Sequence, residues 1–130
     1  MIYFDTSALV KLVFEETESA ALAEWLSVRE DVPKVSSDLS TIELLRTCRR
    51  VADGAVEGAN LLLGGIDLLP MDRAIVEKAA SLVPTELRSL DAIHLASALS
   101  VKTNLTALVA YDVRLCSAAA EAGIEVVSPT

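Results

Sequence analysis

Cysteine and glycine are both scarce in this sequence. Its 130 residues include two cysteines, Cys48 and Cys116, which lie far apart. A disulfide-held secreted domain needs more cysteines, and a zinc or redox motif needs them closer together, so both classes are excluded. Of the five glycines only Gly64 and Gly65 are adjacent. The glycine spacings of a P-loop and of a dinucleotide-binding fingerprint are missing too.

Positive charge is in deficit, with eleven basic against nineteen acidic residues and a formal net charge of −8. This sign is wrong for a protein that holds nucleic acid through its overall charge. A polyanionic partner must therefore meet a locally positive surface or a bound metal ion. Aromatic residues make up 4% of the chain. They are too few and too scattered to form a base-stacking platform.

Long apolar runs are missing as well. The apolar start, MIYFDTSALVKLVF, is interrupted by Asp5 and has no cationic segment before it, so we expect no export signal. No stretch approaches the roughly 20 apolar residues that span a bilayer, and we expect a cytoplasmic protein without membrane contact. A hydrophobic content of 52% fits one compact domain over residues 1–130.

Short β-branched or aromatic segments alternate along the chain with longer stretches of helical spacing. Strands are expected at residues 2–4, 34–36, 66–69, 105–110 and 125–127. Helices are expected at residues 8–13, 20–28, 39–52, 56–63, 72–82, 90–101 and 112–122, the last ended by Gly123. This alternation is typical of an α/β fold whose helices cover both faces of a parallel sheet.

Acidic residues stand where strands end and helices begin. Asp5 directly follows the first expected strand, and Asp112 follows the strand at 105–110 by a residue or two. Glu43 and Asp91 lie near the first turns of two helices, among apolar neighbours. Ligands of open α/β sheets bind at the carboxyl ends of the strands, so we expect these four carboxylates to converge.

Three of the acids have structural alternatives, and those of Asp112 and Glu43 concern helix capping and ion pairing. Asp112 could simply cap the last helix, because aspartate is among the best N-cap residues. Glu43 could complete a capping box with Ser40, or pair with Arg46 three residues on.

Asp91 has alternatives too: it could act as a cap, or pair with Arg88 or His94. His94 is the only histidine and lies among apolar residues. A lone histidine is more often packed or hydrogen-bonded than a ligand, so we expect it to lie outside the site. The two cysteines are expected to be reduced and buried.

Four converging carboxylates would repel one another, and divalent cations would relieve that repulsion. Ligand sets of oxygen alone favour Mg²⁺, with Mn²⁺ as a substitute. Two such ions, roughly 3.5–4 Å apart, assist displacement at a phosphodiester. The acids therefore indicate a metal-dependent nuclease, and the candidates for binding RNA are Arg46, Arg50 and Arg114.

Four segments in this order, FDTSALVKL, STIELLR, LDAIHLASAL and YDVRLCSAAAEAGI, resemble a PIN domain, and specifically the VapC toxins of type II toxin–antitoxin pairs. The resemblance extends over nearly the whole chain. It implies a three-layer α/β/α fold with a central parallel sheet of about four to five strands. It also implies a Mg²⁺-dependent endoribonuclease that is inhibited by a cognate VapB-type antitoxin and forms a homodimer.

The resemblance also assigns roles to residues. Asp5 and Asp91 would be the principal magnesium ligands, with Glu43 in the same cluster and Asp112 a ligand or a water-positioning group. Thr6 and Ser7 would support the site by hydrogen bonding. Many relatives carry a threonine or serine two residues before the last acid, where this sequence has Ala110, so a hydroxyl that would support Asp112 is absent.

Two alternatives come from other classes of protein. Haloacid dehalogenase-type phosphatases need a second aspartate two residues after the first, where this chain has Ser7. A catalytically degenerate PIN module would bind RNA or a protein partner without cleaving RNA. The complete set of four acids favours the enzyme.

Overall fold

The centre of the fold is a five-stranded parallel sheet. The structure, a computed structural model, describes all residues 1–130. Its strands are β1 (Ile2–Phe4), β2 (Lys34–Ser37), β3 (Asp67–Leu69), β4 (Ala107–Val109) and β5 (Val126–Val127). They run in the order β3-β2-β1-β4-β5, and every neighbouring pair is parallel. The predicted α/β fold is confirmed.

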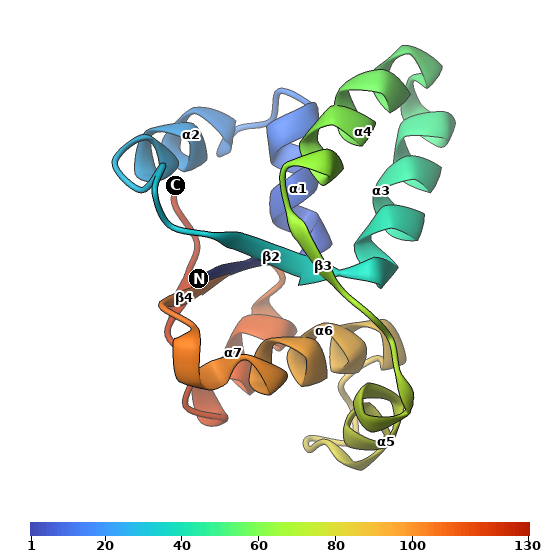
Figure 1. Ribbon diagram of the computed structural model, residues 1–130, viewed down its shortest axis with the longest axis vertical. Helices are drawn as coiled ribbons and strands as arrows, with labels where there is room; N and C mark the ends of the chain where they lie inside the picture. Colours follow the sequence, from blue (N-terminus) through green and yellow to red (C-terminus); the bar gives the residue numbers. More distant parts are fainter.

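Helices cover both faces of this sheet (Figure 1). One layer contains α1 (Thr6–Val13), α2 (Ser19–Ser27), α3 (Asp38–Val51) and α4 (Val56–Gly64). The other contains α5 (Arg73–Ser81), α6 (Ser89–Ser100) and α7 (Val113–Glu121). Short 3-10 turns at Asp53–Ala55 and Lys102–Asn104 join some of these elements. The three-layer α/β/α arrangement is the expected one.

The sheet separates two hydrophobic cores. Along β1, Ile2 and Phe4 pack with buried residues of α1 to α4, whereas Tyr3 packs with buried residues of α6 and α7. Side chains of a strand alternate between its two faces, which explains why a three-residue strand can contribute to both cores. Tyr3 therefore carries a polar hydroxyl into the second core.

The elements differ from the predicted ones mainly at their ends. Strand β4 is shorter than the predicted segment 105–110 because residues 102–104 form a 3-10 turn before it. Asp72 and Asp112 are the N-caps of α5 and α7, where they accept hydrogen bonds from Ile75 N and Leu115 N. Gly123 follows α7 with a φ of 84°, a left-handed conformation that favours glycine.

The strand order places the ends of β1 and β4 side by side. The chain proceeds from β1 to β2 and β3 on one side, then returns to place β4 on the other side of β1. Phe4 pairs with Val109, and Asp5 N donates to Val109 O at 3.0 Å. The sheet thus has its topological switch point between β1 and β4, which is where open α/β sheets bind ligands.

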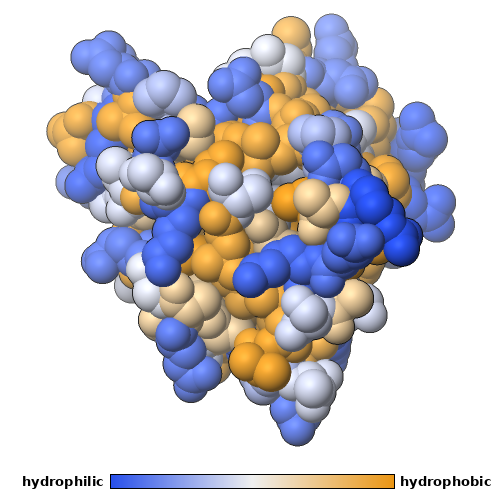
Figure 2. Space-filling model, turned by 60° about the horizontal axis from the view of Figure 1, so that its bottom comes forward, coloured by the Kyte–Doolittle hydropathy of each residue, from blue (hydrophilic) through white to orange (hydrophobic).

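The layer of α5, α6 and α7 exposes apolar side chains. Figure 2 shows this side of the molecule, with hydrophobic residues bordered by hydrophilic ones. A groove between α5 and α6 is lined by Val76, Ala79, Ala80, Ala92 and Ile93 together with Ser89. None of the helices is both long and apolar enough to cross a membrane.

Candidate functional site

Asp5 occupies the junction between β1 and α1. Its side chain is almost fully buried, at 5% exposure. Oδ2 accepts hydrogen bonds from the hydroxyl of Ser7 at 2.6 Å and from Ser7 N at 3.2 Å, which makes Asp5 the N-cap of α1. The Ser7 hydroxyl in turn accepts from Tyr111 N, just after β4. These bonds fix Asp5 at the switch point between the two strands.

Glu43 comes from the second turn of α3 and reaches the same edge of the sheet. Its Oε1 accepts hydrogen bonds from the Thr6 hydroxyl and from His94 Nε2, each at 2.7 Å. Burial opposes ionisation of Glu43, but the bonds from His94 and Thr6 outweigh it and lower its pKa. Glu43 is thus held as a carboxylate by two donors.

The two structural alternatives for Glu43 are wrong. Helix α3 has Ser37 as its N-cap, so Ser40 and Glu43 do not form a capping box. Ser40 instead bonds to the hydroxyls of Ser36 and Thr6, inside the core. The ion-pair partner of Glu43 is His94 and not Arg46.

The expectation that His94 lies outside the site is also wrong. Its ring is 1% exposed, and Nε2 lies 2.7 Å from Glu43 Oε1 and 3.5 Å from Asp5 Oδ1. On the other side of the ring, Nδ1 is 2.8 Å from the hydroxyl of Tyr3. Burial alone would lower the pKa of His94, but the hydrogen bond to Glu43 and the charge of Asp5 raise it.

The sequence does contain a signal for His94. It follows Asp91 by three residues on α6, and residues with that spacing share a helix face. Tyr3 gives a weaker signal, as the one residue of β1 with a polar group.

Asp91 lies in the first turn of α6 and is half-buried. Neither Arg88 nor His94 forms an ion pair with it, and no hydrogen bond supports its carboxylate. Burial, followed by the charges of Asp5 and Asp112, raises its pKa. Asp91 is therefore an acid without a hydrogen-bond or ion-pair partner, and the charges of other acids in the predicted cluster contribute to its raised pKa.

Asp112 caps α7 through Oδ1, which accepts from Leu115 N at 2.9 Å, so its capping role is real. The residue is exposed, and its charge contributes to the raised pKa of Asp91. Ala110 is fully buried, and its carbonyl oxygen accepts from the Ser128 hydroxyl at 2.5 Å. Cys116 was expected to be buried but is only half-buried at the edge of the core between the sheet and α7, where its thiol contacts Ala110 O.

The three arginine candidates are exposed. Arg46 and Arg50 follow Glu43 on α3 by three and seven residues, which places them on the same helix face as the acid. Arg114 follows Asp112 in the first turn of α7. The ion pairs of the structure involve Lys11, Arg73 and His94, so these three guanidinium groups stay available to a partner.

The donor set suits a hard cation. At one edge of the sheet it offers carboxylate oxygens of Asp5, Glu43, Asp91 and Asp112, and burial, followed by the charges of Asp5 and Asp112, raises the pKa of Asp91. No three His, Cys, Asp or Glu side chains lie close enough together to surround one ion in this structure. Asp5, Asp91 and Asp112 remain the acids that are predicted to hold a metal ion.

Comparison with known proteins identifies the family of this chain. The model of the PIN domain family matches residues 2–121. The chain is 43% identical over 132 residues to ribonuclease VapC47 of Mycobacterium tuberculosis (strain CDC 1551 / Oshkosh), covering 99% of this chain and 97% of that protein.

Two solved structures share the fold. One is VapC20 of Mycobacterium tuberculosis, a sarcin–ricin loop-cleaving toxin, with a TM-score of 0.75, 18% identity and coverage of 99% of this chain and 100% of that chain. The other is a toxin–antitoxin complex from Klebsiella pneumoniae, with a TM-score of 0.73, 21% identity and coverage of 100% and 98%. The family match and the close relative show that this chain belongs to the PIN domain family, in its VapC branch.

Proposed function

We propose that this protein is a Mg²⁺-dependent endoribonuclease and the toxin of a type II toxin–antitoxin pair. The observation that carries the proposal concerns Asp91, a half-buried carboxylate without a hydrogen-bond or ion-pair partner. Burial, followed by the charges of Asp5 and Asp112, raises its pKa. Such a group is unfavourable in the protein alone. It becomes favourable when a cation joins the acids.

Each acid has a distinct role in this proposal. Asp5 and Asp91 are the principal metal ligands, and Asp112 is a further ligand or orients water. Ser7 holds Asp5 through Oδ2, and Thr6 holds Glu43 through Oε1. When bound, Mg²⁺ would supply charge stabilisation at the phosphodiester and lower the pKa of an attacking water.

We assign to Glu43 the role of accepting a proton from that water. Its lowered pKa keeps it ionised at neutral pH, and a group in this state can accept a proton through a hydrogen bond. Arg46 and Arg50 extend along α3 from Glu43 and provide a local positive surface for the RNA backbone. This local positive surface offsets the repulsion between RNA and a protein with a net charge of −8.

Three exposed apolar residues, which we call the rim, stand next to acids of the site in the sequence, and exposed apolar side chains suit a protein partner. Ile42, Leu90 and Val113 adjoin three of the acids in the sequence and are 52%, 49% and 77% exposed. We assign this rim to a VapB-type antitoxin that covers the acids and inhibits cleavage. We assign the groove between α5 and α6 to the homodimer, because its lining is mostly apolar.

Cleavage of total RNA tests the proposal. The purified chain, freed of any bound partner, is incubated with Mg²⁺ or Mn²⁺, with EDTA, and as Asp5→Asn. Cleavage by the wild type with metal, and its loss in both controls, is the expected result. Equal cleavage in all three samples would reject the site. Tight RNA binding without cleavage by the partner-free protein would favour the degenerate PIN module.

A further inference from the structure

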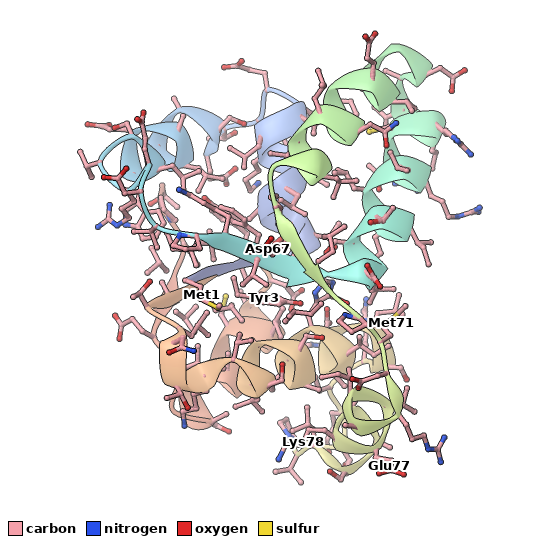
Figure 3. All side chains as sticks on the ribbon, viewed as in Figure 1. Met1, Tyr3, Asp67, Met71, Glu77 and Lys78 are labelled. Carbon is pink, nitrogen blue, oxygen red and sulfur yellow. The ribbon has the colours of Figure 1, made fainter.

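A chain of polar groups crosses the second core and ends at the acids. Tyr3 and His94 are 0% and 1% exposed, and their rings meet edge to face at 6.0 Å between centroids. Tyr3 projects from β1 to the side of the sheet that α6 covers (Figure 3). Its hydroxyl lies 2.8 Å from His94 Nδ1, and His94 Nε2 lies 2.7 Å from Glu43 Oε1.

The direction of the last bond follows from the chemistry of its partners. An ionised carboxylate only accepts hydrogen bonds, so Nε2 must carry a proton and donate to Glu43. In neutral imidazole Nδ1 then accepts from the Tyr3 hydroxyl, and in imidazolium it donates to the hydroxyl oxygen. In both states Tyr3 fixes the ring, and Nε2 faces the acids.

The ring contacts two acids at once. Besides Glu43 Oε1, Nε2 lies 3.5 Å from Asp5 Oδ1. The second donor to Glu43 is Thr6, whose hydroxyl bonds to Ser40; Ser40 bonds to Ser36, and Ser36 donates to Phe4 O. Oε1 of Glu43 thus accepts hydrogen bonds from two buried donors, the Thr6 hydroxyl and His94 Nε2. The other, Oε2, makes no hydrogen bond of its own within the protein.

We propose that His94 is a positioning residue of the site and that Tyr3 acts through it, with the His94 Nε2–H group setting the orientation of Glu43 and Asp5 toward a divalent cation. This inference rests on the proposed metal-dependent function. A purely structural role would require only that the ring fill space between β1 and α6. A positioning role requires a donor at the place of Nε2.

Two substitutions separate these roles. In His94→Gln the side-chain amide can reach the position of Nε2, whereas in His94→Asn it reaches only that of Nδ1. Both variants are polar and leave part of the ring volume empty. Mn²⁺ affinity, measured by calorimetry on the partner-free protein, and the kcat and KM of RNA cleavage are the readouts, with Leu95→Val as a control in the same core.

The expected loss for His94→Asn is about 10- to 100-fold in Mn²⁺ affinity, the range for outer partners of metal ligands. Its kcat falls while the KM for RNA changes little. His94→Gln stays within a few-fold of the wild type, and Leu95→Val binds Mn²⁺ normally even where its melting temperature falls. Tyr3→Phe weakens Mn²⁺ binding in the wild-type background and has no further effect in His94→Asn.

Equal Mn²⁺ affinity in His94→Asn and the wild type would overturn the inference while leaving the proposed function intact. Equal losses in His94→Asn and His94→Gln would also overturn it, because packing alone would then explain both. If His94→Asn fails to fold, unchanged Mn²⁺ affinity in Tyr3→Phe rejects the role of Tyr3, and weakened binding in His94→Gln rejects that of His94. A wild type that binds no Mn²⁺ contradicts the metal-dependent function itself.

Discussion

Asp5 and Asp91 come from opposite layers of the molecule, yet the charge of Asp5 adds to burial in raising the pKa of Asp91. Asp5 begins the helix that follows β1, and Asp91 lies in the first turn of α6. The Asp5 carboxylate has Ser7 as its hydrogen-bond partner, whereas that of Asp91 has none. Asp91 is therefore the acid of this pair whose charge no hydrogen bond compensates.

Asp91→Asn is expected to stabilise the metal-free protein. A raised folded-state pKa means that ionised Asp91 disfavours the native state. The stability gained by the substitution is therefore complete above this pKa and disappears below the pKa of Asp91 in the unfolded chain. In EDTA at pH 7 we expect the melting temperature to rise by a few degrees. Asp67→Asn, at an exposed position of β3, is the control. A lower melting temperature for Asp91→Asn would contradict the assignment.

Mg²⁺ is expected to stabilise the wild type. A ligand that binds only the native state adds about 2.7 kcal/mol at 100 times its dissociation constant. Thermal melts over a Mg²⁺ series should show a rising midpoint for the wild type and a much smaller rise for Asp5→Asn. Equal shifts for the two proteins would place the bound ion elsewhere.

The pair of His94 and Glu43 should make stability depend on pH in EDTA. The folded-state pKa of His94 is raised, so its contribution is complete below the ordinary value of 6.5 and is lost as pH rises through the raised value. That of Glu43 is lowered, so its contribution is complete above 4.5 and is lost as pH falls through the lowered value.

The two contributions overlap between pH 4.5 and 6.5. His94→Gln removes the titrating ring and isolates its effect. The difference in melting temperature between the wild type and His94→Gln should be larger at pH 6 than at pH 9. A difference that stays constant or grows over this range would show that the charge of His94 adds nothing.

Arg46→Glu is expected to weaken RNA binding more than Lys78→Glu. Both substitutions change the charge equally at exposed positions, but Arg46 shares a face of α3 with Glu43, and Lys78 lies on α5 in the other layer (Figure 3). Losing one phosphate contact lowers the slope of log affinity against log salt by about 1. Fluorescence anisotropy of labelled RNA, measured in a catalytically inactive Asp5→Asn background, would detect it. Equal effects of the two substitutions would remove Arg46 from the RNA surface.

Much of the fold was predictable because local signals and topology agree. Five short strands separated by helical stretches specify a parallel sheet, and Asp5 directly after β1 marks its ligand-binding edge. The ends of elements were less predictable. Residues 105 and 106 have the composition of a strand, but the 3-10 turn before them delays β4 to Ala107.

The surroundings of the acids were only partly predictable. The positions of Asp5 and Asp112 follow from strand ends, whereas the contact of His94 with Glu43 joins α6 to α3, and no local pattern specifies such a pair. A lone histidine is usually packed or hydrogen-bonded, and His94 is both, but its hydrogen-bond partner is an acid of the site. Its spacing from Asp91 placed it on the same helix face as that acid. The orientation of α6, which directs His94 toward Tyr3 of β1 and Glu43 of α3, determines this contact.

The most direct test of the central claim is anomalous diffraction from crystals of the partner-free protein grown with Mn²⁺. A peak beside the carboxylates of Asp5 and Asp91, at the roughly 2.0–2.5 Å typical of hard cations bound by oxygen, is the predicted result. A fully resolved edge of the sheet without such a peak, at a Mn²⁺ concentration that supports RNA cleavage, would contradict the account.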